Sequence, residues 1–161
     1  MKSTAAGRIL VSLGAGLVAG TTNLIAGGAI YGGTLTHGLQ LIASGVLGAP
    51  AFSGGAATAV LGACLHYTIS IVAAGLYCEI ARRESRLRQH WLVGGIVFGV
   101  IAYLVMNLIV VPLSNAANPD FSAAMVAKEL VAHTVMFGLP IAGIVALYFR
   151  RRPASGIQAR A

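Results

Sequence analysis

Four long apolar segments dominate this sequence and set the main limit on its fold. They cover about residues 9–30, 55–80, 91–113 and 125–149. A helix rises 1.5 Å per residue, so about 20 apolar residues cross a hydrocarbon layer of about 30 Å. The pattern predicts an all-α fold, a polytopic bundle of four transmembrane helices, and one membrane domain over residues 1–161.

The composition excludes an ordinary water-soluble domain. Of the 161 residues, 57% are hydrophobic and only 9% are charged. A domain of this size has too much surface to hide that much apolar area from water. We therefore expect lipid to be the solvent for most of the chain.

Basic residues stand next to the ends of the apolar segments. Ten of the eleven lysines and arginines fall at three places: Lys2 and Arg8; Arg82, Arg83, Arg86 and Arg88; and Arg150, Arg151, Arg152 and Arg160. Four crossings bring all three places to one side of the membrane, which the positive-inside rule makes the cytoplasmic side. The prediction is a bacterial inner-membrane protein with both termini in the cytoplasm.

The start of the chain also resembles a secretory signal. Lys2 and Arg8 precede an apolar stretch that includes the small residues Val18-Ala19-Gly20. The apolar character continues to Ile30, farther than in a typical signal core. We interpret the segment as a retained first span, and the later topology is the same if it is cleaved.

The outer segment, residues 31–54, is rich in glycine and contains a weaker helical pattern. Leu35, Leu39, Ile42 and Val46 are spaced so that they share one helical face. A crossing here would invert everything downstream and move the central arginines outside. The segment predicts a short interfacial or re-entrant helix between the first two spans.

Small residues recur at helical spacing within the spans. In lipid, such residues let helix backbones approach closely. We interpret them as packing seams inside one bundle, with contacts between two copies as the alternative; they include Gly16 and Gly20, Gly62, Gly75, and Gly95 and Gly99.

Five polar side chains fall inside the predicted spans: Asn23, His66, Asn107, Glu129 and His133. Polar groups left unpaired in lipid are costly, so each must face the bundle interior, a cavity or a partner. At 1.5 Å per residue, three of them lie roughly 10 Å below the outer surface and His66 lies roughly 15 to 20 Å below it. The five are therefore candidates for one polar cluster or cavity in the outer half.

Spacing on single helices strengthens this cluster. Glu129 and His133 are four residues apart, so their side chains share a face and can hydrogen-bond, and the same spacing relates His66 to Ser70. Three roles remain open: hydrogen bonds that hold the helices together, a proton-linked or substrate-binding cavity, and a transition-metal or haem site at the two histidines.

The remaining histidines and cysteines carry no recognisable site. His37 and His90 fall at the two membrane surfaces. Cys64 and Cys78 lie about 21 Å apart if they share one helix, too far for a disulfide. The spacing matches no zinc motif. We expect no catalytic residues, no resident metal and no cofactor.

Residues 65–152 contain a set of features that together match a known family pattern. They are His66 with Ser70, Leu76-Tyr77-Cys78, Trp91 opening the third span, Pro112-Leu113 closing it, Glu129-x-x-x-His133, and Arg150-Arg151. Through this set the chain resembles the YagU family of bacterial inner-membrane proteins. The resemblance implies an inner-membrane location and no particular activity. The chain departs from the family's pattern in its short outer segment, and Asn107 has no matched equivalent.

These observations favour a structural or accessory membrane subunit. The alternative is a small proton-linked transporter, or a small-molecule- or metal-binding membrane protein, that uses the outer-half polar cavity. An enzyme would need an acid and base pair near a substrate path, and Glu129 with His133 is the one such pair in the sequence. Expected partners are membrane lipids, a second copy and other membrane proteins. Aromatic residues do not alternate with the arginines, so nucleic acid is not expected.

Overall fold

The computed structural model describes residues 4–117 and 120–150. Within them, four helices are long and apolar enough to cross a membrane: Ala5–Tyr31, Gly55–Arg83, Trp91–Val110 and Ala123–Arg150. This confirms the all-α fold with four candidate spans. Parts of the predicted basic clusters and of the outer loop lie outside the described residues, namely Lys2, Asn118, Arg151, Arg152 and Arg160.

The first and second spans are the helices α1 (Ala5–Tyr31) and α3 (Gly55–Arg83). Between them lie α2 (Leu35–Leu47) and a 3-10 helix, η1 (Ala49–Ser53). This pair confirms the prediction of a short helix between the first two spans.

The third and fourth spans are each built from more than one kind of helix. After the short helix α4 (Ser85–Gln89), α5 (Trp91–Val105) continues as the π-helical segment η2 (Met106–Val110). The fourth span joins α6 (Ala123–Val131), the π-helical segment η3 (Ala132–Gly138) and α7 (Leu139–Arg150). The third helix was predicted to reach residue 113 but ends at Val110, because Pro112 has no N–H with which to continue it.

Hydroxyl side chains and glycines define several helix ends. Thr4 accepts a hydrogen bond from the Gly7 N–H at 3.1 Å and begins α1, and Thr34 does the same for His37 at 3.2 Å in α2. Such side chains satisfy N–H groups that have no partner in the first turn. α1 and α2 end at Gly32 and Gly48, whose φ values of 70° and 66° suit glycine best.

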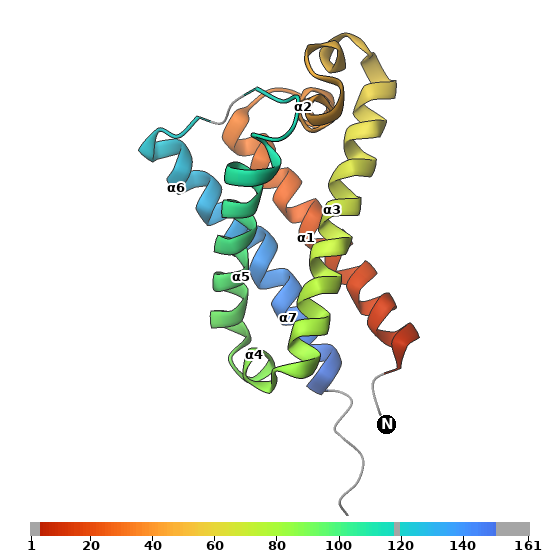
Figure 1. Ribbon diagram of the computed structural model, residues 1–161, viewed down its shortest axis with the longest axis vertical. Coiled ribbons are helices and arrows are strands. Elements are labelled where there is room, and N and C mark those ends of the chain that lie inside the picture. The colour runs from red at the N-terminus through yellow and green to blue at the C-terminus, as the bar shows by residue number, and fades with distance from the viewer. Residues whose placement is uncertain (1–3, 118–119, 151–161) are drawn as a thin grey trace, which may run out of the picture.

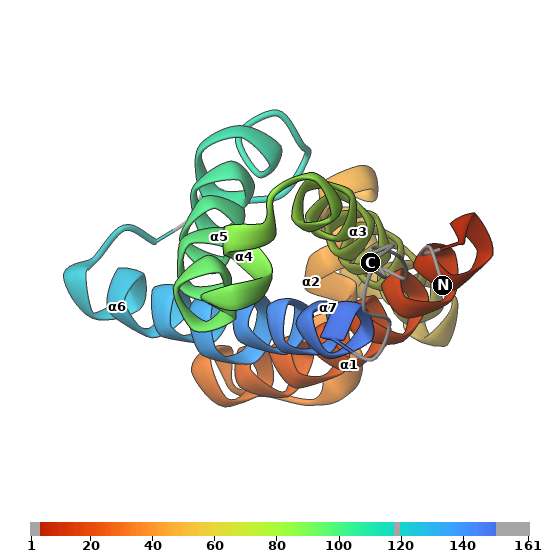
Figure 2. The ribbon, with the colours of Figure 1, turned by 90° about the horizontal axis from the view of Figure 1, so that it is seen from below.

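The four spans run along the long axis of the molecule, and α2 lies across one end of it (Figure 1). We call this end the α2 end. The start of α1, the end of α7 and the whole of α4 lie at the opposite end (Figure 1). Viewed from there, α7 lies between α1 and α5 (Figure 2), and it also contacts α3.

Arginines gather at the end opposite α2, which we call the basic end. Arg8 of α1 and Arg82 of α3 both pair with Glu79, at 2.5 and 2.8 Å. Arg88 of α4 donates to the Ala81 and Arg82 carbonyls at the end of α3, at 2.5 and 3.0 Å. These contacts hold together the start of α1, the end of α3 and α4.

Close backbone contacts confirm the packing seams within the chain. A Cβ placed on Gly16 would lie 2.5 Å from the Ile71 Cα, and one on Gly20 would lie 3.0 Å from the Ser70 Oγ. On the other side of the bundle, a Cβ on Gly99 would lie 2.5 Å from the Thr134 Cα. At Gly16 and Gly99 a side chain would meet the backbone of the neighbouring helix and force the helices apart, whereas at Gly20 the Ser70 and Tyr67 side chains would have to give way.

The α2 helix packs on α3 through its small and polar face. Its buried residues are Gln40, Ala43 and Ser44, and the Gln40 side chain donates to the Gly55 carbonyl at 3.1 Å. The predicted apolar face points outward, with Leu35 67% and Val46 54% exposed. This orientation, across the bundle with an apolar outer face, favours an interfacial helix over a re-entrant one.

The α2 helix is also tied to the segment that follows the third span. The Asn115 side chain donates to the Val46 carbonyl at 2.8 Å, and its main-chain N–H donates to the Gly45 carbonyl at 2.9 Å. These bonds satisfy carbonyls at the end of α2. The helix therefore bridges α3 and the third span at the α2 end.

A proline interrupts the fourth span and is compensated from another helix. Pro140 has no N–H, so the Met136 carbonyl four residues earlier loses its usual helical partner. The Thr22 hydroxyl of α1 donates to this carbonyl. The Leu139 N–H bonds instead to the Thr134 carbonyl, five residues back, and closes η3. A side chain of the first span thus replaces a main-chain bond of the fourth.

We predict that Thr22→Val lowers the free energy of unfolding by about 1 to 2 kcal/mol, because it leaves the Met136 carbonyl without a donor. In a Pro140→Ala background the restored N–H can serve that carbonyl, so the same substitution should cost less than about 0.5 kcal/mol. Unfolding in mixed detergent micelles measures both values. An equal cost in the two backgrounds would contradict this role for Thr22.

We predict that Gly62→Ala displaces α2, because a Cβ on Gly62 would fall onto the Leu39 carbonyl. The expected loss of stability is about 1 to 3 kcal/mol, the usual cost of overpacking. Gly14→Ala is the matched control, since a Cβ on Gly14 meets nothing within 4 Å. Equal stability of the two variants in thermal unfolding would show that α2 does not pack as described.

Candidate functional site

Glu129 is the most buried of the charged candidates. It lies on α6 and is 7% exposed, and its carboxylate accepts a hydrogen bond from the Tyr31 hydroxyl at the end of α1. Within residues 4–117 and 120–150 it forms no ion pair with a lysine or arginine; the ion pairs there involve Glu79. A phenol is therefore the donor that supports this carboxylate inside the bundle.

His133 lies one turn below Glu129 but does not bond to its side chain. Its Nδ1 lies 2.8 Å from the Glu129 main-chain carbonyl. A carbonyl only accepts, so Nδ1 carries the proton. The predicted spacing of four residues thus connects the two residues through the main chain, and the carboxylate accepts from Tyr31.

Tyr103 joins His133 to Asn107. The His133 ring meets the Tyr103 ring edge-on, with 5.7 Å between centroids, and the Asn107 side chain donates to the Tyr103 carbonyl at 3.2 Å. Asn107 is buried within η2. The third span therefore brings the Tyr103 ring to the fourth span, while the Asn107 side chain bonds within its own span.

His66 faces the first span. Its Nε2 lies 2.8 Å from the Gly20 carbonyl, so this nitrogen carries the proton. The neighbouring Tyr67 hydroxyl lies 3.0 Å from the Thr21 hydroxyl, and Ser70 donates back to the His66 carbonyl at 2.8 Å. Within the described part of the chain, His66 makes no hydrogen bond to His133.

Asn23 is the candidate that the structure leaves apart. It is half-buried on α1, and its side chain makes no hydrogen bond to the other four candidates among the described residues. Two other residues of α1 bond to the fourth span, Thr22 to the Met136 carbonyl and Tyr31 to Glu129. Sequence reasoning missed both; Pro140 inside an apolar segment was the signal that a hydroxyl donor would be needed near it.

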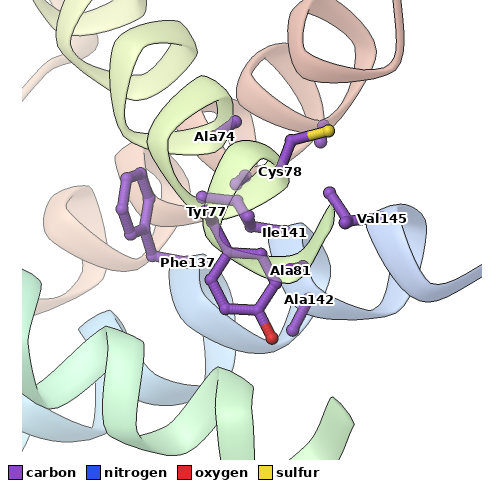
Figure 3. Packing of buried hydrophobic residues seen from close by; sticks show 10 residues of the cluster. Ala74, Tyr77, Cys78, Ala81, Phe137, Ile141, Ala142 and Val145 are labelled. Atoms are coloured by element: carbon purple, nitrogen blue, oxygen red, sulfur yellow. The ribbon is translucent and has the colours of Figure 1, made fainter. Parts of the chain in front are cut away.

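An apolar core separates this cluster from the charges of the basic end. The core includes Ala74, Tyr77, Cys78, Phe137, Ile141, Ala142 and Val145, whose side chains meet between α3 and the η3–α7 part of the fourth span (Figure 3). Ala74, Ile141, Ala142 and Val145 are fully buried.

The hollow that the structure shows on α1 lies elsewhere. An open groove of about 300 Å³ is lined by Leu17, Val18, Thr21 and Thr22. Neither His66 nor His133 lines it. In the described residues, no three histidine, cysteine, aspartate or glutamate side chains lie close enough together to hold a metal ion.

Comparison with protein-family models, with curated proteins and with solved structures gives no significant match to this chain. The four-span fold defines its class, and its role has to be argued from the contacts described above.

We predict that Tyr31→Phe lowers the free energy of unfolding by about 1 to 3 kcal/mol, because it removes the donor to a buried carboxylate. Glu129→Gln should be tolerated, since an amide keeps an acceptor and nearly the same shape. In a Glu129→Leu background, Tyr31→Phe should cost much less. Unfolding in detergent measures the free energies of this double-mutant cycle. If Tyr31→Phe lowers the free energy of unfolding equally whatever residue stands at position 129, the Tyr31–Glu129 hydrogen bond is refuted.

Proposed function

We propose that this chain is a multi-pass protein of the bacterial inner membrane, with both termini in the cytoplasm, that acts as a structural or accessory membrane subunit. Four apolar spans and the arginines gathered at one end support the location and the orientation. The resemblance of residues 65–152 to the YagU family supports the same location.

The observation that carries the proposed role is how the buried polar groups are used. His66, Asn107 and His133 each bond to a main-chain carbonyl, and Glu129 accepts from Tyr31. The bonds of His66 and Glu129 join α3 and α6 to α1, those of Asn107 and His133 stay within their own spans, and an apolar core lies between these residues and the basic end. This is the arrangement expected of a stable scaffold.

The partners of such a subunit would meet its apolar outer faces. Large hydrophobic side chains are exposed along every span, among them Leu17, Val72, Ile101 and Val131. We propose that lipids cover most of this surface and that other membrane proteins, or a second copy, cover part of it.

A second candidate is a proton-linked binding or transport protein, and one observation favours it. Glu129 is buried within a span without a cationic partner in the described residues, and ionisable groups in that position commonly serve function. Proton flux through reconstituted vesicles that disappeared in Glu129→Gln would favour this candidate over the scaffold.

We predict that the basic end faces the cytoplasm. In a background without Cys64 and Cys78, a cysteine at Ala117 should react with an impermeant thiol reagent added to intact cells. A cysteine at Arg86 should react only after the membrane is permeabilised, because the positive-inside rule keeps this end inside.

Labelling of both variants in detergent is the control, since both positions are exposed. The reverse labelling pattern in intact cells would overturn the proposed orientation, and labelling of both would overturn the four-span topology.

A further inference from the structure

Tyr77 buries a hydroxyl that nothing around it satisfies. Its side chain is 2% exposed, and in the described part of the chain the hydroxyl has no hydrogen-bond partner. The ring packs edge-on against Phe98 of α5, with 5.0 Å between centroids, and the hydroxyl points away from Phe137 and Cys78 (Figure 3). A buried polar group without a partner disfavours the arrangement that buries it.

The α4 helix helps to cover this hydroxyl. A Cβ on Gly94, near the start of α5, would lie 2.6 Å from the Tyr77 hydroxyl oxygen and 3.2 Å from Cδ2 of Leu87, so the three residues meet at one place. Leu87 belongs to α4, and its side chain packs on the apolar core. The position of α4 therefore keeps water away from the Tyr77 hydroxyl.

The α4 helix has little of its own to stabilise it. It has five residues, Ser85–Gln89, none of them is buried, and it lies between the ends of α3 and α5 at the basic end (Figure 1). A helix of little more than one turn is not stable by itself in water. Segments with few buried apolar contacts open locally at a much lower free energy than the whole protein unfolds.

Arg88 attaches α4 to two of the spans. Its guanidinium donates to the Ala81 and Arg82 carbonyls at the end of α3, at 2.5 and 3.0 Å, and lies 5.2 Å from the centre of the Phe149 ring of α7. These contacts favour the position of α4 that covers Tyr77, whereas the buried hydroxyl disfavours it.

From these opposed contacts we propose that α4 is a hinged cover at the basic end. Arg88 holds the cover closed. When it opens, Leu87 leaves the core and the Tyr77 hydroxyl gains hydrogen bonds to water. The hinges are Glu84 and His90, the two residues with non-helical main-chain angles that flank α4. This movement requires only the four-span fold, and it is independent of the orientation and of the subunit role.

Hydrogen–deuterium exchange of the whole protein in detergent micelles measures the opening. The His90 N–H donates to the Arg86 carbonyl at 2.8 Å, so its exchange reports on α4. Tyr77→Phe should slow this exchange about tenfold, because the closed cover then buries no unpaired hydroxyl. Arg88→Gln should speed it about tenfold, because α4 loses the bonds of the guanidinium to α3.

Two matched variants serve as controls. Tyr67→Phe removes a hydroxyl that has a partner, the Thr21 hydroxyl at 3.0 Å. Arg86→Gln removes an exposed charge from α4 and leaves the Arg88 contacts in place. Neither should change the exchange of the His90 N–H.

Faster exchange or a lower unfolding temperature in Tyr77→Phe would show that the hydroxyl has a partner in solution, and would overturn the proposal. Wild-type exchange in Tyr77→Phe, or an equal acceleration in Arg86→Gln and Arg88→Gln, would overturn it as well. Because Tyr77→Phe removes none of the bonds described above, it is decisive even if Arg88→Gln does not fold.

Discussion

Lipid offers no hydrogen bonds, so every main-chain polar group inside a membrane needs a partner from the protein itself. The fourth span breaks its own helical ladder at Pro140 and therefore depends on α1 for the hydroxyl of Thr22. The same dependence holds at Glu129 of the fourth span, which also takes its donor from α1, the Tyr31 hydroxyl. The first and fourth spans are thereby joined at two levels, and the rest of the bundle is arranged around this pair.

Close approach of the backbones makes these polar bonds possible. Hydroxyl and imidazole groups reach a neighbouring helix's carbonyl only when the two axes are near, and glycines provide that at Gly16 and Gly20 on one side and at Gly95 and Gly99 on the other. His66 shows how a close approach at a glycine and a polar bond occur together, since the carbonyl that it contacts belongs to Gly20. Small residues and polar residues thus act together.

Length and apolar character were enough to predict the spans, because a helix must satisfy its own main chain in lipid and few other solutions exist. The same reasoning predicted a short helix between the first two spans. The helical spacing of its apolar residues could not show that the opposite, polar face with Gln40 would pack on α3. Polar residues inside spans could be named as candidates from sequence. Their partners could not, because Glu129 had a near neighbour in His133 and a distant one in Tyr31, and only the packing of α1 on α6 decides between them.

The joining of the first and last spans bears on how the chain matures. A ribosome delivers α1 to the membrane first, and α3 can dock on it through their glycine seam as soon as α3 follows. Until the last helix is inserted, the Thr22 hydroxyl has only the Val18 and Ala19 carbonyls of its own helix, and the Tyr31 hydroxyl lacks the Glu129 carboxylate. The hydrogen bonds of the interior are therefore complete only when the fourth span has been synthesised and inserted. A chain that stops before the fourth span exposes polar groups that a membrane protease or chaperone can recognise.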